Sequence, residues 1–453
     1  MHPRTWIVLT AGLTCTLSAL VPARAGAAII TVGGSGAAAA TIAAGIAMSS
    51  AGDNIVVAPG TFNEQNIVIP HNLTITAAGS AGSVIVNLGG GAGFSANGVS
   101  TVTLIGLSLQ NGHAFSAGAA VDFSNCGYVL LQNCSFLDNQ ATDYGGAVSL
   151  YESEFGLYGC SFENNTAGTY AGGALSITGS SSNGTISGCS FSGNSADAAG
   201  AVSLADGEAA ITGCWFESNS ATNSGGAILA LNATSLTVEN STFLNCTAGT
   251  GGAIAQPAAM GAFGMEITAC LFSECKATFG GGAVSSGEAP VITACTFLDC
   301  LAESLGGAIY TDSGSIENCT FYGNQAAGAG AALFVYSSAS IERNIISTSS
   351  GQPAVDQPFA TGIACNVFHD NLAGNAETAT DPVGSNGNVE LDPRFCDAGA
   401  SDFHLAVDSP AAADNVPLAC GATDIGAWPV ACGETAVRTT SWGRLKSRYG
   451  NRR

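Results

Sequence analysis

Basic side chains are scarce in this sequence. Of 453 residues only 11 are Lys or Arg, against 33 Asp or Glu. Two of the basic residues lie before residue 26 and six lie after residue 433, so the long middle of the chain contains only Lys276, Arg343 and Arg394. A surface this acidic repels nucleic acid, anionic lipid and polyuronates, and we expect no nucleic-acid partner.

The chain also lacks the short motifs of common enzymes. It contains no HExxH, no GxSxG and no GxxxxGK[ST] sequence. Beyond the leader the histidines are isolated from one another: His71, His113, His369 and His404. The sequence therefore predicts no metal, no cofactor and no catalytic residue of these classes.

Long apolar runs are absent as well, except near the start. The run from Ile7 to Val21 follows Arg4 and precedes a small-x-small site at Ala23 to Ala25. It is too short for a membrane span and is typical of a cleaved signal peptide. Cys15 lies in "GLTC", a poor lipobox. We expect residues 1–25 to be a signal peptide, and the mature chain to be secreted or held at the cell surface without a membrane span.

A repeat fills most of the remaining chain. The stretch "NCSFLDNQATDYGGAVSL" from Asn133 returns in close variants every 24 to 29 residues. Its cysteine position falls at residues 134, 160, 189, 214, 241, 270, 295, 319 and 344, with Ser at 241 and Asn at 344. A period that varies by a few residues is typical of a solenoid, whose turns absorb insertions.

Three apolar or special positions define each repeat. Phe follows the cysteine position by two residues, as in Phe136 and Phe216. An aliphatic residue precedes the cysteine position by three residues, as in Leu131. Because alternation fails between that residue and the cysteine, we expect a bend or bulge there. Asn follows the Phe by three residues at positions 139, 165, 194, 219 and 324, where we expect a left-handed turn and amide bonds between repeats.

A glycine pair and a second strand complete the repeat, as at Gly145–Gly146 before "AVSL". Short strands separated by turns, without helical segments, predict an all-β fold: a right-handed parallel β-helix with three short strands per coil, about a dozen coils and capped ends. Cys and Phe would share the inward face of the first strand, and the Phe side chains would stack in the core.

The alternating motifs resemble those of a known family. "FLDN", "FENN", "FSGN" and "FESN", followed by "GGAV", "GGAL" or "GGAI", resemble the FxxN and GGA[ILV] repeats of polymorphic outer-membrane proteins. The resemblance covers residues 107–345 and implies a β-helix passenger involved in adhesion. The chain departs from that family after residue 345, where no run of alternating ten-residue strands follows.

Both ends of the repeat resemble those of other β-helix proteins. The start, with Asp53, Pro59, Gly60 and Glu64, resembles the pectate-lyase-like opening, which implies a cap helix over residues 41–51. The segment from Leu391 resembles the closing segment of secreted bacterial β-helix proteins, which implies a cap on the last coil. We therefore divide the chain into a cap with first coils (26–106), repeats (107–351), last coils with a cap (352–433) and a basic tail (434–453).

The mature chain would carry 15 cysteines, an odd number. Seven lie in the inward column, and three replace Asn at positions 246, 275 and 300. Cys270, Cys275, Cys295 and Cys300 have the composition of a Cys₄ zinc set, but in an exported chain a disulfide such as Cys275–Cys300, or free thiols, is the preferred interpretation. In the C-terminal cap we predict a disulfide between Cys420 and Cys432.

Carboxylates recur along one turn of the repeat. Those at 17 to 20 residues past the cysteine position are Glu152, Glu154, Asp206, Glu208, Glu288 and Asp312, and a second set at four residues past it is Asp138, Glu274 and Asp299. Such a ridge is a solvated acidic face, a Ca²⁺ site or the acid pair of a hydrolase. Three scattered basic residues are too few for a polysaccharide lyase of this fold.

The sequence thus favours an exported, monomeric β-helix that binds a glycan, a host cell or a neighbouring cell in the manner of an adhesin. The alternative is a hydrolase that degrades a neutral glycan with acids of the turn ridge. The tail after Glu434 carries six basic residues together with Trp442, Leu445 and Tyr449. It could bind the acidic body of its own chain, anionic envelope material or a sorting receptor.

Overall fold

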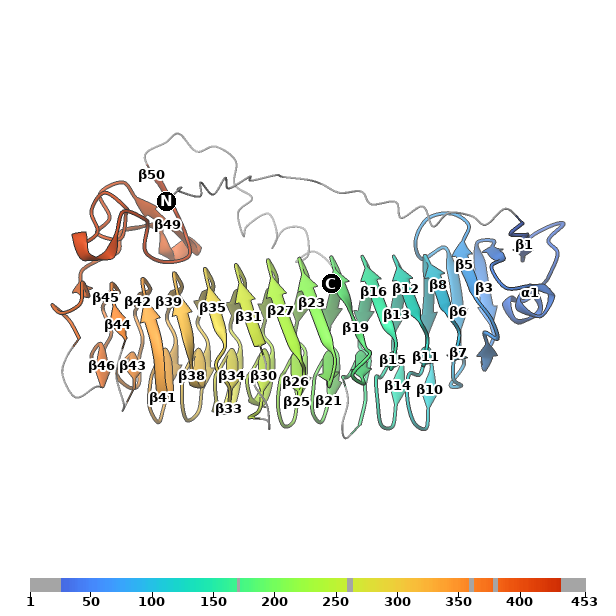
Figure 1. Cartoon of the computed structure of the whole chain (residues 1–453), viewed down its shortest axis with the longest axis horizontal. Coiled ribbons are helices and arrows are strands. Elements are labelled where there is room, and N and C mark those ends of the chain that lie inside the picture. The colour runs from blue at the N-terminus through green and yellow to red at the C-terminus, as the bar shows by residue number, and fades with distance from the viewer. Residues whose placement is uncertain (1–25, 169–171, 259–263, 358–361, 378–381, 433–453) are drawn as a thin grey trace, which may run out of the picture.

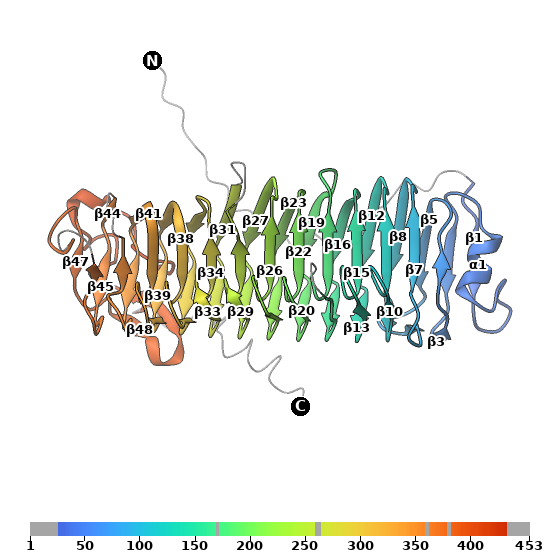
Figure 2. The ribbon, with the colours of Figure 1, turned by 90° about the horizontal axis from the view of Figure 1, so that it is seen from below.

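The computed structural model describes residues 26–168, 172–258, 264–357, 362–377 and 382–432. The predicted signal peptide and basic tail lie outside the described residues. The chain winds into a long solenoid whose coils lie side by side along one axis, as Figures 1 and 2 show. Neighbouring coils pair in parallel throughout the solenoid, which confirms the all-β parallel β-helix.

One coil illustrates the plan. It runs through β12 (Tyr128–Gln132), β13 (Ser135–Leu137), β14 (Gln140–Ala141) and β15 (Val148–Tyr151). The strands β12 and β15 belong to sheet A, which has 25 strands, whereas β13 lies in the 14-stranded sheet B. The short β14 pairs with β10 (His113–Ala114) in the narrow sheet C. Sheet C consists of this pair and, in later coils, a group of six paired strands. A coil therefore has up to four strands in three sheets, one more strand than predicted, and the solenoid is longer than a dozen coils.

Sheet B carries the predicted phenylalanine column. Its strands are β3 (Gly60–Asn63), β6 (Val84–Asn87), β9 (Leu107–Gln110), β13, β17 (Ser161–Glu163), β20 (Ser190–Ser192), β24 (Trp215–Glu217), β28 (Thr242–Leu244), β32 (Leu271–Ser273), β36 (Thr296–Leu298), β39 (Thr320–Tyr322), β42 (Ile345–Ser347), β45 (Val367–His369) and β47 (Val389–Glu390). From Phe136 to Phe321 each ring stacks on the next, with centroids 4.7–4.9 Å apart. All eight rings are fully buried, which confirms their inward direction.

The cysteine position is a corner rather than part of a strand. The residue before it has a left-handed backbone, with φ of 52° at Asn133 and 61° at Gly159, and β13 begins only at Ser135. The predicted bend is therefore confirmed, whereas the prediction that Cys134 belongs to the strand is wrong. The chain turns here because sheets A and B meet at an angle, and the buried thiol fills the inside of the corner.

A second corner holds the asparagine ladder. The backbone N–H of Asn165 donates to Oδ1 of Asn194 at 2.9 Å, and Nδ2 of Asn194 donates to the carbonyl of Phe162 at 3.1 Å. The left-handed residue is the one before each Asn, for example Asn164 with φ of 54°, so the predicted turn is displaced by one position. The ladder satisfies backbone groups that the corner removes from the sheets.

Thiols take the same place where Asn is absent. Sγ of Cys246 donates to the carbonyl of Phe216, as Nδ2 of Asn219 does to that of Phe191. Eleven cysteines in the described coils are free and buried, including Cys275 and Cys300, so the free-thiol interpretation holds there. Among the residues described, no three His, Cys, Asp or Glu side chains are grouped closely enough to hold a metal ion.

The disulfides differ from the predicted pair. Cys420 is bonded to Cys365 and Cys432 to Cys396, so the prediction of a Cys420–Cys432 bond is wrong. Three strands explain the second bond: β48 (Phe395–Asp397) pairs with β49 (Asp402–Ala406), which pairs with β50 (Val430–Cys432). This small sheet brings Cys396 to Cys432, whereas Cys420 lies beside the coil corner at Cys365.

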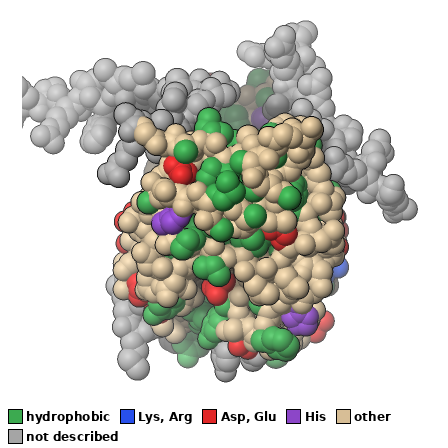
Figure 3. All heavy atoms as spheres, turned by 90° about the vertical axis from the view of Figure 1, so that its right-hand side faces the viewer, with side chains coloured by type: hydrophobic (Ala, Val, Ile, Leu, Met, Phe, Trp, Pro, Cys, Tyr) green, Lys and Arg blue, Asp and Glu red, His purple; other side chains and the backbone are tan. Residues whose placement is uncertain are grey.

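A short helix closes the first coil. Helix α1 (Ile42–Met48) buries Ile42 and Ile46 in the core, and the Thr41 side chain caps it. The carboxylate of Glu64 accepts the N–H groups of Ile42 and Ala43 at 2.7 and 2.9 Å. The predicted cap helix is therefore present, although it ends three residues earlier than expected. Figure 3 looks onto this end, where polar and backbone atoms surround scattered apolar side chains.

Asp53 should make this first coil sensitive to acid. Its carboxylate accepts the N–H groups of Ser50 and Ala28, both at 2.8 Å, and these bonds lower the pKa of Asp53. A carboxyl group whose pKa is lower in the folded chain than in the unfolded chain stabilises the fold at any pH above its unfolded-state pKa. That stabilisation is lost as the pH falls through its folded-state pKa. We expect Asp53→Asn to lower the thermal midpoint at pH 7. The difference from the natural protein should shrink below about pH 4, and a constant difference would contradict the assignment.

The segment from residue 391 to 432, here called the C-terminal module, packs on the side of the solenoid. Figure 1 shows it above the last coils. Leu405, Ala411 and Ile425 form a core with the outward side chains of Ile345 and Val367 on sheet B. Nε1 of Trp428 donates to Oγ1 of Thr296 at 2.8 Å. We predicted that this segment would cap the last coil, and that prediction is wrong. The segment packs instead on the apolar outer face of sheet B.

Arg343 fastens the module to a coil corner. Its guanidinium donates to Oδ1 of Asn318 within the solenoid and to the carbonyls of Cys420, Thr423 and Asp424 in the module. The carbonyl of Arg343 in turn accepts the N–H of Gly426 at 2.9 Å. One of the three basic residues of the body thus has a structural role.

Candidate functional site

The acidic ridge lies at the bend between the two sheet A strands of a coil. Glu152 and Asp206 occupy the bend itself, with left-handed φ of 45° and 64°. Glu154 and Glu208 are the first residues of the strands that follow, β16 (Glu154–Tyr158) and β23 (Glu208–Thr212). Between the two acids of the first pair, Ser153 is buried and its Oγ accepts the N–H of Cys126 at 2.9 Å. The inward serine separates two acids that both lie on the outer side of the coil.

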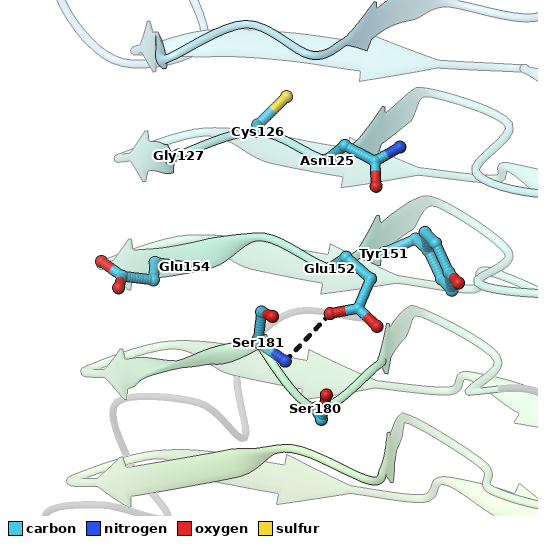
Figure 4. A pocket seen from close by; sticks show the side chains of 8 residues that line it. All are labelled: Asn125, Cys126, Gly127, Tyr151, Glu152, Glu154, Ser180 and Ser181. Atoms are coloured by element: carbon cyan, nitrogen blue, oxygen red, sulfur yellow. Dashed lines mark hydrogen bonds between the residues drawn. The ribbon is translucent and has the colours of Figure 1, made fainter.

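An open depression of about 690 Å³ lies on this ridge. Its lining comes from three neighbouring coils: Asn125, Cys126, Gly127, Tyr151, Glu152, Glu154, Ser180 and Ser181. Figure 4 shows Glu152 and Tyr151 at one end and Glu154 at the other. Two of the six predicted ridge acids therefore share one site. Asp206, Glu208, Glu288 and Asp312 do not line it.

Glu152 is held as a carboxylate. Its Oε2 accepts the backbone N–H of Ser181 at 3.0 Å, and hydrogen bonds from the Ser181 side chain and backbone lower the pKa of Glu152. Figure 4 shows this contact with the Ser180–Ser181 turn of the next coil. A group with a lowered pKa is a poor proton donor at neutral pH, so Glu152 does not have the properties of a general acid.

Tyr151 lines the depression, and two further tyrosines lie on the neighbouring strands β12 and β16. Tyr151 and Tyr158 have exposed fractions of 46% and 37%, and Tyr128 lies half-buried beside Tyr158. Gly156, on the strand between them, leaves room for these rings, because a Cβ there would collide with both Tyr128 and Tyr158. Burial, Tyr158 and Glu154 together raise the pKa of Tyr128, which stays a neutral phenol. These tyrosines were not predicted from the sequence as site residues, although Tyr151 and Tyr158 are the last residues of the short strands on either side of the acidic pair.

A second group of aromatic residues and acids lies near the other end of sheet A. Tyr310 on β38 (Ile309–Glu317) stacks on Phe334 of β41 (Leu333–Glu342) with centroids 5.5 Å apart. The hydroxyl of Tyr310 donates to Oδ1 of Asp312 at 3.5 Å. Burial raises the pKa of Asp312, the hydrogen bond from Tyr310 offsets part of that rise, and the charge of Glu288 adds to it. The depression at Glu152, whose lining converges from three coils, is therefore the site considered for function.

The corner acids are spread along the opposite edge of sheet B. Asp138, Glu274 and Asp299 are the left-handed residues that precede the ladder position, with φ between 51° and 55°. Burial raises the pKa of Asp299, and neighbouring Glu274 raises it further. Their backbone conformation, rather than a shared ligand, accounts for their regular spacing.

The three basic residues of the body lie away from the depression. Arg343 is bonded to the C-terminal module, and Arg394 forms an ion pair with Asp408 inside that module. Lys276 is exposed at the start of β33 (Lys276–Gly280) in sheet C. None of the three lines the depression.

Two solved structures are similar to this chain at low identity. The pectate lyase Pel9A is 12% identical over 89% of this chain and 96% of its own, with a TM-score of 0.38. A mutant of the PL6-family alginate lyase AlyGC is 10% identical over 76% of this chain and 98% of its own, with a TM-score of 0.16. Similarity this low supports no statement about activity. No curated protein matches the sequence.

A family model covers most of the solenoid. The model described as "Right handed beta helix region" matches residues 62–243 and 201–391. The match begins at the third strand and ends where the C-terminal module begins. It also agrees with the predicted handedness, whereas the finer resemblance to polymorphic outer-membrane proteins stays a prediction. The chain belongs to the right-handed β-helix family.

Proposed function

We propose that the protein is exported and acts outside the cell or at its surface, where the depression at Glu152 and Glu154 binds a neutral glycan. The exposed ring of Tyr151, which lines the depression together with Glu152 and Glu154, is the observation that carries the proposal. The exposed ring of Tyr158 lies further along the strand that begins at Glu154. A tyrosine ring offers an apolar face to the C–H groups of a sugar, and carboxylates accept bonds from its hydroxyls. A negative site disfavours uronates for the same reason that it disfavours other anions.

Binding without cleavage is the form of the proposal that the site supports best. A glycosidase needs a carboxylic acid that is protonated before it donates, together with a second carboxylate at a defined separation. The pKa of Glu152 is shifted in the wrong direction for that acid. A hydrolase remains the alternative because the pKa of Asp312 is raised. An adhesin-like role, with a glycan of a host or neighbouring cell as partner and a monomer as the binding unit, is part of the same proposal.

Removing the tyrosines should weaken glycan binding. A panel of neutral and acidic glycans would first identify a bound member, and titration calorimetry would then compare variants. We expect Tyr151→Ala to raise the dissociation constant about tenfold, since one lost ring contact is worth about 1.4 kcal/mol. Tyr158→Ala should raise it by a smaller factor, because Tyr158 lies outside the lining of the depression. Tyr144→Ala is the matched control, because Tyr144 has an exposed fraction of 41% but neither lines the depression nor lies on the strands β15 and β16 that flank it.

A reducing-end assay on the bound glycan separates the two functions. Binding that persists for hours without new reducing ends supports the binding protein. Release of reducing ends that Asp312→Asn or Glu208→Gln abolishes would support the hydrolase. Unchanged affinity in both tyrosine variants would remove the depression from consideration.

A further inference from the structure

Within the described residues, the C-terminal module covers the outer face of sheet B over part of its length. Under the C-terminal module, the outward residues Thr296, Thr320, Ile345 and Val367 are each at most 3% exposed. In the preceding coils the corresponding residues Leu271, Thr242 and Trp215 are only half-buried. The face on which the module is bound therefore continues beyond it.

This continuing face is apolar with acidic neighbours. Leu271, Leu244 and Trp215 project from β32, β28 and β24, and Glu217 follows Trp215 on the same strand, where it accepts a bond from the indole Nε1 at 3.2 Å. Glu163 occupies the equivalent outward position two strands further on and is exposed. We call these five residues the open face of sheet B. An occupant should combine apolar side chains with positive charge.

We propose that the basic tail of this same chain, residues 434–453, binds the open face of sheet B and extends the cover that the module begins. The tail has six basic residues and one acid, with Trp442, Leu445 and Tyr449 among them, so its charge and its apolar side chains complement the face. It begins two residues after Cys432, and Cys432 belongs to the small sheet of the module that already lies on sheet B.

The geometry allows this arrangement. Adjacent strands of a sheet lie about 4.8 Å apart, so the strands from β36 to β17 span roughly 25 Å. Twenty residues reach up to about 66 Å when extended. Charge attraction between the tail and the acidic body would be screened by salt, and the apolar contacts with Leu271 and Leu244 would not.

Zero-length carbodiimide cross-linking of the full chain tests the proposal. The whole sequence has only two lysines, Lys276 and Lys446, so cross-linked peptides report on the tail with little ambiguity. We expect Lys446 to be joined to Glu217 or Glu163 within one chain. Links of Lys446 mainly to acids of the sheet A ridge, links between chains, or no link at all would overturn the proposal.

Tryptic cleavage of the tail provides the second measurement. In the folded chain we expect cleavage after Arg444 and Lys446 to be at least about fivefold slower than in a free peptide of residues 434–453. Glu217→Gln should remove the corresponding cross-link and speed cleavage. Glu154→Gln, a neutralised acid on the other face, should change neither result. Cleavage as fast as in the free peptide would overturn the proposal, independently of whether the depression binds a glycan.

Discussion

Replacing Phe216 by alanine is expected to lower the free energy of unfolding by about 3–5 kcal/mol, the cost of removing a large buried side chain from a packed core. Phe216 is fully buried, and its ring stacks on Phe191 and Phe243 with centroids 4.8 and 4.7 Å away. The solenoid offers no route by which the core could collapse into the gap, because every neighbouring coil is held in place by parallel pairing on both sides.

Urea denaturation followed by circular dichroism measures this loss. Phe115→Ala is the matched control, since that ring is 91% exposed and its removal should cost less than about 0.5 kcal/mol. In a solenoid, coils can unfold separately, so hydrogen exchange should be compared between the coils around Phe216 and those near α1. Equal midpoints for the two variants would show that the phenylalanine column does not stabilise the fold as its burial indicates.

Replacing Asn194 by leucine should be as damaging, by about 3–6 kcal/mol, for a different reason. Oδ1 of Asn194 accepts from the backbone N–H and the Nδ2 of Asn165, while its own Nδ2 donates to the carbonyl of Phe162 and to Asn219. Leucine is similar in size but leaves several of these buried groups without partners, and each such group costs about 1–3 kcal/mol.

Asn194→Cys is the informative comparison, because the chain itself places cysteine at this position in later coils. Cys246 donates from Sγ to the carbonyl of Phe216, and Cys300 donates to that of Phe272. We expect the cysteine variant to lose less than half as much stability as the leucine variant in the same urea titration. If both variants lost the same amount, hydrogen bonding at the corner would not be the reason for the repeat of Asn and Cys.

The repeated residues predicted the solenoid well because each of them is constrained by its neighbours in the coils above and below. Phe136 and its equivalents had to point inward for eight coils to stack, and the structure shows the rings in contact. The corner at Cys134 was predicted only as a bend, since a period-two pattern shows where alternation stops but not which residue turns the chain.

Features that occur once were harder to predict. The position of the C-terminal module depends on contacts such as Trp428 with Thr296, which are 132 residues apart in sequence. No periodicity relates such residues, and for the same reason the partner of Cys420 was predicted wrongly. At the candidate site, the acids Glu152 and Glu154 were found by their spacing, whereas the role of Ser181 in fixing the charge of Glu152 depends on a contact between adjacent coils.

The distribution of cysteines has a consequence for how this protein matures. Four sulfur atoms are oxidised, and three of these residues, Cys396, Cys420 and Cys432, lie at the end of the described chain and are synthesised last. Eleven others become inaccessible once their coils have closed. In an oxidising compartment, correct pairing would therefore require that coil formation outrun thiol oxidation, and a slow-folding variant would accumulate mispaired, cross-linked aggregates rather than merely unfolded chains.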